Sequence, residues 1–322
     1  MAATEQIKNL IKSFGEGDES CFYATAMQIA AAEARKGHVA IAEELKKLID
    51  KGKSSTSIVK RLPVNAAQKE LNDLLELVSP EIKLKDMVLS SVIQETLEKV
   101  IYEQRHLKKL LSHNLQPRRK LLLVGTPGSG KTMTAHALAG ELGLPLFVIR
   151  LDGLISRYLG ESIAKLRLIF DAMVDFRAVY LFDEFDSIGS TRSHGQDVGE
   201  IKRVLNSFLL QIEKDKSNSL IIAATNLPKS LDNALFRRFD DIIEYGNPFF
   251  EQINQIYSSR LDELDISSIC NLHQLSQLSL GLSYAEVHKI CEDIWKDFLI
   301  FGNDYVTEKR INQYIENRKR TY

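Results

Sequence analysis

Short apolar runs alternate with amphipathic stretches through the middle of the chain, from about residue 120 onward. Runs that are apolar at nearly every position are typical of strands buried on both faces, and the amphipathic stretches between them suit helices. This alternation predicts an α/β fold in which helices cover both faces of a parallel sheet. The predicted strands are Leu121–Val124, Leu146–Ile149, Val179–Phe182, Leu220–Ala224 and Ile242–Tyr245.

The two ends of the chain carry helical patterns instead. Near the start, apolar side chains recur at intervals of three and four, which predicts a compact module of three helices separated at glycines. Residues 51–62 are polar and rich in serine, as in a linker, and helices are predicted over 64–78 and 88–113. After Pro248 no strand is predicted, and the apolar stripe over Tyr284–Phe298 indicates a small helical domain.

These patterns predict four successive parts of the chain. Residues 1–50 would form the N-terminal helical module, which would select a substrate or partner, and residues 51–83 a linker and a helix. Residues 84–246 would form the large α/β domain that contains the sheet. Residues 247–322 would form the small helical domain at the end.

Composition and charge narrow the class of protein. Hydrophobic residues make up 44% of the chain and charged residues 26%, which excludes a wholly disordered or fibrous protein. The net charge of −1 gives no overall field that would attract nucleic acid or a membrane. No apolar run approaches the length of about 18 residues that a membrane span needs. The cysteines Cys21, Cys270 and Cys291 form no close pair, so a reducing, cytoplasmic setting is expected.

The strongest chemical signal is a glycine-rich segment with the spacing of a Walker A motif, Gly125-Thr-Pro-Gly-Ser-Gly-Lys-Thr132. Glycines let the backbone amides fold around phosphates, Lys131 would neutralise them, and the Thr132 hydroxyl would bind Mg²⁺. A chance glycine-rich turn is the alternative, which the strand before the segment and the helix after it disfavour. The expected nucleotide-binding residues here are Thr126, Pro127, Gly128, Ser129, Gly130, Lys131, Thr132 and Met133.

Polar residues also end two later strands. Asp183 and Glu184 follow an apolar run, as in a Walker B motif: Asp183 would hold Mg²⁺ and Glu184 would activate the attacking water. Asn226 follows the next predicted strand, where it could contact the γ-phosphate or that water. The alternatives are a solvated acidic turn and an asparagine that merely begins a loop.

These elements, in this order, resemble the AAA+ ATPases over about residues 84–300, and most closely the subfamily of the proteasomal ATPases, katanin and spastin. The resemblance implies a P-loop domain with a helical lid, binding of ATP with Mg²⁺, and assembly into a ring of identical subunits, a hexamer in this group. The segment Leu231–Asp240 resembles the second region of homology of this family, whose arginines reach the nucleotide of the neighbouring subunit. Arg237 and Arg238 would take that role here, unless they are ordinary surface arginines.

Two further segments carry the resemblance. Ser156–Ser162 is similar to the first pore loop, in which Tyr158 and Leu159 would grip a polypeptide, although Tyr158 could instead pack against its own domain. The segment Gly281–Glu286 is similar to the element that opens the lid helix, which implies that Gly281 and Ala285 lie near the adenine. Asp86 and Met87 belong to a weaker match with the stretch that reads the adenine edge.

The sequence therefore predicts a Mg·ATP-dependent protein remodeller or unfoldase that pulls a polypeptide client through a ring. No protease motif is present, so a separate peptidase would have to degrade the client if degradation occurs. One alternative is a nucleic-acid motor or loader, although only a short basic tail over Arg318–Arg320 supports it. Another is a scaffold that uses ATP only to assemble, which the presence of Lys131, Asp183 and Glu184 disfavours.

Overall fold

The chain divides into two compact units, Met1–Pro63 and Val64–Tyr322, which are described separately. These two units do not coincide with the four parts predicted from the sequence. The boundaries of those four parts stay a prediction. The computed structural model describes Lys8, Ser13 and residues 19–35, 37–56, 66–154, 159–185, 197–227, 233–264, 270–302 and 305–320.

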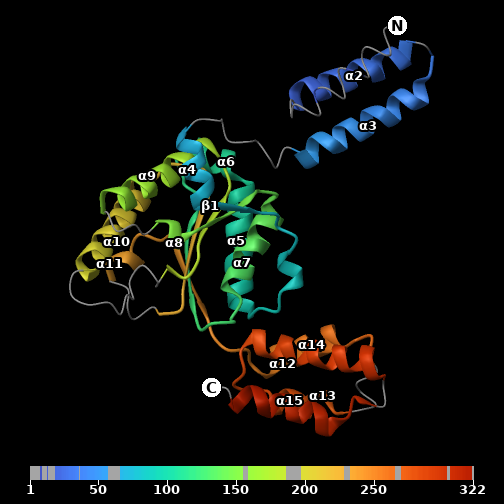
Figure 1. Ribbon diagram of the computed structural model, residues 1–322, viewed down its shortest axis with the longest axis vertical. Coiled ribbons are helices and arrows are strands. Elements are labelled where there is room, and N and C mark those ends of the chain that lie inside the picture. Colours follow the sequence, from blue (N-terminus) through green and yellow to red (C-terminus); the bar gives the residue numbers. More distant parts are fainter. Residues whose placement is uncertain are drawn as a thin grey trace. The chain divides into compact units, whose positions relative to one another are not determined.

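In the described part of the first unit, α2 (Glu19–Arg35) and α3 (Val39–Thr56) lie side by side (Figure 1). Gly37 allows the sharp reversal between them because it has a φ of +89°, in the left-handed region that favours glycine. Apart from Lys8 and Ser13, the first of the three expected helices lies outside the described residues. Helix α3 continues to Thr56, so the predicted linker begins too early; lysines are good helix formers and carry the helix onward.

The second unit is built on a six-stranded sheet with the order β1-β3-β4-β5-β2-β6. The α/β fold and its five parallel strands are confirmed, each within about a residue of the predicted bounds. They are β2 (Lys120–Gly125), β3 (Leu146–Ile149), β4 (Val179–Phe182), β5 (Leu220–Thr225) and β6 (Asp241–Tyr245).

The sixth strand, β1 (Leu75–Val78), contradicts the helix predicted over 64–78. Helix α4 covers only Ala66–Leu74, and β1 then pairs antiparallel with β3, with Leu75 opposite Ile149. The sequence pattern of this segment suits either element, and pairing with the open edge of the sheet decides between them. The predicted helix over 88–113 is also interrupted, because α5 (Ser91–Arg105) and α6 (Leu107–Ser112) meet at His106.

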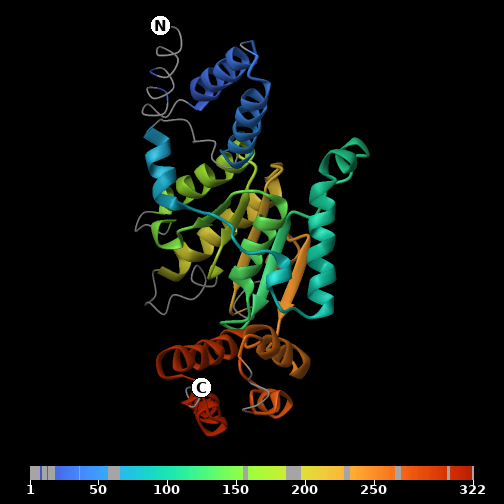
Figure 2. The same ribbon diagram turned by 90° about the vertical axis from the view of Figure 1, so that its right-hand side faces the viewer.

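Helices cover both faces of the sheet (Figure 2). One face packs against α5 and α7 (Lys131–Leu142), where Leu97 and Leu138 join Leu121 and Leu181 in a fully buried cluster. The opposite face carries aromatic side chains from α9 (Leu159–Asp175) and α10 (Asp197–Lys214). The remaining short helices of this domain are η1 (Leu84–Asp86), α8 (Leu151–Leu154) and α11 (Asn233–Phe236).

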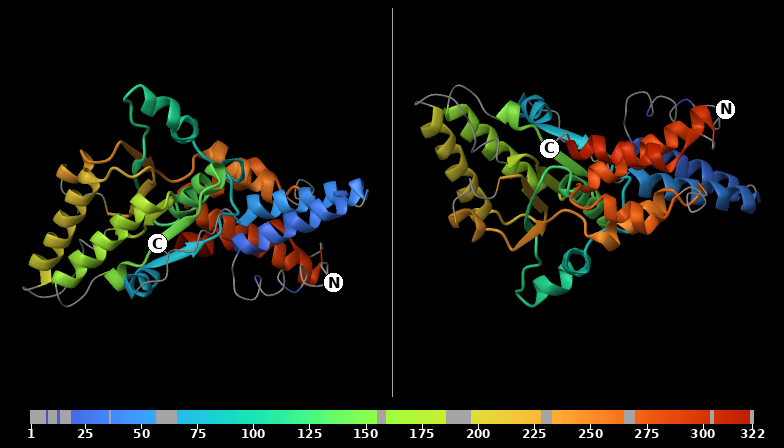
Figure 3. Two further views of the ribbon diagram at one scale, coloured as in Figure 1. Left: turned by 90° about the horizontal axis from the view of Figure 1, so that it is seen from above. Right: turned by 90° about the horizontal axis from the view of Figure 1, so that it is seen from below.

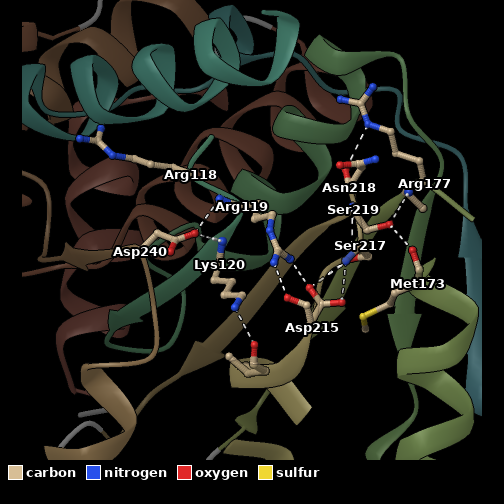
Figure 4. A network of polar contacts seen from close by, with 12 residues as sticks. Arg118, Arg119, Lys120, Met173, Arg177, Asp215, Ser217, Asn218, Ser219 and Asp240 are labelled. Carbon is tan, nitrogen blue, oxygen red and sulfur yellow. Dashed lines mark hydrogen bonds and ion pairs between the residues drawn. The ribbon is translucent and has the colours of Figure 1, made fainter. Parts of the chain in front are cut away.

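A buried ion pair joins the end of α10 to the start of β2 (Figure 4). The Arg119 guanidinium contacts the Asp215 carboxylate and also donates to the Asp215 carbonyl oxygen at 2.6 Å. Asp215 accepts two further hydrogen bonds from Ser217, at 3.1 and 3.2 Å. Next to this pair, the Asp240 carboxylate accepts from the backbone amides of Arg119 and Lys120, both at 2.9 Å. Three segments of the domain are thereby held together: the end of α10, the start of β2 and the residue before β6.

The last described helices of the chain, orange to red in Figure 3, pack around an apolar core of their own. They are α12 (Phe250–Arg260), α13 (Leu272–Leu278), α14 (Tyr284–Phe301) and α15 (Glu308–Arg320). Ser283 begins α14 through a capping box, in which its hydroxyl accepts from the Glu286 amide while the Glu286 carboxylate accepts from the Ser283 amide. Among the helices that the structure describes, none is both long and apolar enough to span a membrane.

Candidate nucleotide-binding and catalytic site

The glycine-rich segment connects β2 to α7 and has the backbone geometry of an anion-binding loop. Gly128 and Gly130 have φ values of +75° and +100°, in the left-handed region, and Gly130 caps α7. A Cβ atom at Gly125 would lie 2.4 Å from the carbonyl oxygen of Tyr245 on β6, so only glycine fits there. The loop therefore presents its amides at the N-terminus of a helix, an arrangement that attracts phosphate.

The ammonium group of Lys131 lies inside this loop. The residue is buried, and its Nζ donates to the carbonyl oxygens of Gly125 and Thr126, each at 2.8 Å. It also donates to the Ser129 hydroxyl at 3.4 Å. These contacts fix a positive charge next to the converging amides, where the charge of a bound polyphosphate would need neutralising.

The two carboxylates at the end of β4 lie beside the loop. Asp183 accepts a hydrogen bond from the Thr132 hydroxyl at 2.7 Å and another from the Glu184 amide at 2.9 Å. Glu184 has a φ of +48°, which is unusual for a residue with a side chain, and it is exposed. A hydroxyl and a carboxylate in contact form an all-oxygen donor set, the kind that Mg²⁺ prefers.

A cavity of about 390 Å³ joins these groups. It has a polar end at the loop and at Asp183, and an apolar end formed by Met87, Val88 and Leu89 together with Ala285 of α14. This volume and this division suit a nucleotide, with its charged phosphates and flat base. The lining residues are Asp86, Met87, Val88, Leu89, Pro127, Gly128, Ser129, Gly130, Lys131, Thr132, Met133, Asp183, Glu184, Asn226, Tyr284, Ala285 and His288.

Most of the predicted nucleotide-binding residues line this cavity, together with Asn226, but two of them do not. Thr126 and Gly281 are absent from the lining that the described residues provide, and both instead contact Asn247. Asp86 is among the lining residues, and its carboxylate accepts a hydrogen bond from the Lys83 amide at 2.9 Å, which caps η1. The roles assigned to these residues from the sequence stay predictions.

Sequence reasoning missed Tyr284 and His288, which α14 brings to the cavity on either side of Ala285. Burial raises the pKa of Tyr284 to about 12. Burial, together with the charge of Arg260, lowers the pKa of His288, which favours the neutral imidazole. The spacing of three residues between Ala285 and His288, which places both on one helix face, is the signal that could have identified the histidine.

The two arginines lie outside the cavity of their own chain. Arg237 is exposed, whereas Arg238 is half-buried and its Nε lies 3.2 Å from a Glu213 carboxylate oxygen on α10. The segment that carries them is anchored at Asp240 by the amides of Arg119 and Lys120. Among the described residues, neither arginine lines the nucleotide cavity.

The candidate pore loop is only partly visible. Tyr158 lies outside the described residues. Leu159 is described by its backbone alone, as the first residue of α9. The predicted contact of these side chains with a polypeptide therefore stays a prediction.

Comparison with known proteins identifies a family and a relative that matches over nearly the whole chain. The family model described as "ATPase family associated with various cellular activities (AAA)" matches residues 121–247. The whole chain is similar to an uncharacterized AAA family ATPase, y4kL, of Sinorhizobium fredii (strain NBRC 101917 / NGR234). The two are 34% identical over 322 residues, which cover 99% of this chain and 96% of the relative.

Proposed function

The chain belongs to the AAA family of ATPases, and we propose that it is a protein remodeller that works as a ring of identical subunits. The family membership establishes an ATP hydrolase and suggests an oligomer. The proposal that it remodels proteins is more specific than the family membership, and it rests on the sequence Tyr158-Leu159-Gly160. In the sequence an aromatic and an aliphatic residue stand next to a glycine here, and Leu159 is the first residue of α9.

Each polar group of the cavity has a distinct part in hydrolysis. The amides of Gly128–Thr132 and the Lys131 ammonium would bind the phosphates, and Thr132 and Asp183 would hold the metal ion. When bound, Mg²⁺ neutralises charge that develops on the phosphates in the transition state. The Glu184 carboxylate accepts a proton from the attacking water, and the Asn226 amide orients that water.

Assembly would complete the site with a cation from the neighbouring subunit. Arg237 is the better candidate of the two arginines because it is exposed, whereas Arg238 is paired with Glu213 in its own chain. A guanidinium at the transferring phosphoryl group stabilises the transition state, so hydrolysis would depend on ring formation. A hexamer is the ring size that the resemblance implies.

The client would be an extended polypeptide, gripped without regard to its sequence. Tyrosine offers a large contact area and loses little conformational entropy when it binds. A ring that presents Tyr158 and Leu159 from every subunit would hold the client through many weak contacts. The N-terminal unit would recruit the client or a partner protein, such as a separate peptidase.

The test compares Tyr158→Ala with Tyr158→Phe in the full-length chain. Tyr158→Ala removes an aromatic but no phosphate ligand, so ATPase activity should stay within about threefold of wild type, or less than ~1 kcal/mol in the barrier. Unfolding of a fluorescent, tagged client should fall to background, and Tyr158→Phe should retain most of it. The exposed Tyr305 in the small domain provides a matched control, since Tyr305→Ala should unfold the client normally. Normal client unfolding by Tyr158→Ala would exclude the proposed grip.

A further inference from the structure

Asn247 lies between β6 and α12, where the chain passes from the sheet to the small helical domain, and its side chain bridges two segments far apart in sequence. Its Oδ1 accepts a hydrogen bond from the Thr126 hydroxyl of the glycine-rich loop at 3.3 Å. Its Nδ2 donates to the carbonyl oxygen of Gly281, just before α14, at 3.1 Å. One amide side chain therefore joins the phosphate-binding loop to the small domain.

A second link runs directly between the same two segments. The Ala285 amide donates to the Gly128 carbonyl oxygen at 3.0 Å. A Cβ atom at Gly128 would lie 2.9 Å from the Ala285 Cβ and 3.1 Å from the Ser283 hydroxyl. Position 128 therefore needs glycine for two reasons, the positive φ and the close contact with the small domain. The small domain thus packs directly on the loop.

This docking decides whether the nucleotide cavity is complete. The small domain contributes Tyr284, Ala285 and His288 to the cavity lining, and the loop contributes the opposite side. None of these three described residues is a lysine or arginine, so the small domain offers no cation to the phosphates here. The backbone contact at Ala285 and the bridge through Asn247 couple its position to the loop.

We propose that Asn247 is a positioning residue that couples the phosphate-binding loop to the small domain, and so sets how much of the protein is ready to bind nucleotide. A ligand enclosed by both sides binds the docked state more tightly than the undocked one. The apparent dissociation constant therefore rises by the factor by which the docked fraction falls. This inference rests on the nucleotide cavity alone and is independent of any client.

The first experiment follows hydrogen exchange of single backbone amides in the full-length protein without nucleotide. The Ala285 amide lies in the first turn of α14, where no helix carbonyl precedes it, so its protection depends on the Gly128 carbonyl oxygen. The nearby Val287 amide donates within the helix to Ser283. In Asn247→Ala, exchange at Ala285 should accelerate about threefold or more while exchange at Val287 stays unchanged, which shows that α14 is still folded.

The second experiment measures ADP binding by calorimetry and ATP turnover at saturating ATP. Asn247→Ala should weaken ADP binding about 3- to 10-fold, the range that corresponds to one or two hydrogen bonds. Turnover at saturating ATP should stay within about twofold of wild type, because the bound nucleotide restores docking.

Asn247→Asp has nearly the same shape but loses the donor to Gly281, so it should behave like Asn247→Ala. Asn312→Ala on α15, outside the cavity lining, is the matched control and should match wild type.

Thr126→Val removes the same bridge from the other side. It should accelerate exchange at Ala285 when made alone, and should add nothing when made in Asn247→Ala. Unchanged exchange at Ala285 in Asn247→Ala, or additive effects of the two substitutions, would overturn the proposal. Turnover that falls in parallel with ADP affinity would overturn it as well, since Asn247 would then act in the chemical step.

Discussion

At the scale of single residues, the two carboxylates that end β4 differ in their surroundings. Asp183 accepts from the Thr132 hydroxyl and from the Glu184 amide, which fixes its orientation. Glu184 is exposed and lines the nucleotide cavity. A carboxylate held in one orientation suits a metal ligand, whereas an exposed one can exchange a proton with water, and this difference separates their expected roles.

Glu184→Gln should leave ATP binding within about threefold of wild type, because no phosphate or metal contact is removed. Turnover should fall at least ~10²-fold, the usual scale of a lost general base. Phosphate release measures turnover, and equilibrium binding of ATP gives the affinity. Glu244→Gln makes the same change of charge at an exposed position on β6 outside the cavity lining and should retain full turnover. A Glu184→Gln variant with near-normal turnover would rule out this role.

His288 predicts a pH dependence of stability with a definite sign. Burial lowers its pKa below the ordinary value of 6.5, so acidification protonates the unfolded chain first. The contribution of His288 to the free energy of unfolding is therefore complete above about pH 6.5. It is lost as the pH falls through the lower pKa that His288 has in the folded state. The thermal unfolding midpoint should drop less between pH 7.5 and 5.5 in His288→Gln than in wild type. His113→Gln, at an exposed position, serves as the control; an equal drop in all three proteins would contradict the prediction.

The phosphate end of the cavity could be predicted from the sequence, and much of the base end could not. Lys131, Thr132 and Asp183 follow from local motifs, because a strand, a glycine-rich turn and a helix fix their geometry within a few residues. His288 reaches the cavity through the docking of α14 on the loop, where Ala285 contacts Gly128, and Asn247 reaches the loop through its hydrogen bond with Thr126. Both contacts join residues more than a hundred positions apart, so the helical spacing of Ala285 and His288 points to the histidine only once Ala285 is placed in the site.

At the scale of elements, burial explains which predictions were right. The five parallel strands are apolar at most positions, so their sequences suit a buried strand and little else. The edge strand β1 is half-exposed and short, and its sequence Leu75-Glu-Leu-Val78 also continues the helical pattern of α4. Its pairing with β3 is a tertiary effect, which propensity alone does not reveal.

The buried ion pair between α10 and β2 predicts the effect of breaking it. Asp215→Ala leaves the Arg119 guanidinium buried without its carboxylate, so the free energy of unfolding should fall by about 3–5 kcal/mol. Replacing both residues, as in Arg119→Met with Asp215→Leu, should cost clearly less, because no unpaired charge remains. Urea denaturation measures both. If the single and double variants lose equal free energy of unfolding, the network stabilises the protein through packing and hydrogen bonding and not through the paired charges.

At the scale of the whole molecule, the chain combines an ATPase with a separate helical unit. The boundary falls between Pro63 and Val64, and β1 follows soon after it in the chain. All residues of the nucleotide cavity belong to the second unit. The first unit is therefore expected to serve recruitment and not hydrolysis.

A chain that begins at Val64 tests this division. It should fold, assemble and hydrolyse ATP within about twofold of the full-length rate, because every cavity residue and the sheet remain. Unfolding of a client should fall, since recruitment is lost, while a client fused directly to the shortened chain should still be processed. Circular dichroism, chromatography and phosphate release provide the measurements. A shortened chain that fails to fold would show that the first unit is part of the ATPase.

The left-handed backbone conformation of Glu184 means that the residue proposed for catalysis lowers the thermal stability of the protein. A residue with a Cβ at a φ of +48° carries a conformational cost on the order of 1 kcal/mol that glycine avoids. Glu184→Gly should therefore melt at a higher temperature than wild type while it loses hydrolysis, whereas Glu184→Gln should lose hydrolysis and gain no stability. A screen that selects only for survival at high temperature would then favour inactive proteins at this position. An unchanged melting temperature in Glu184→Gly would show that the glutamate side chain compensates for its own strain.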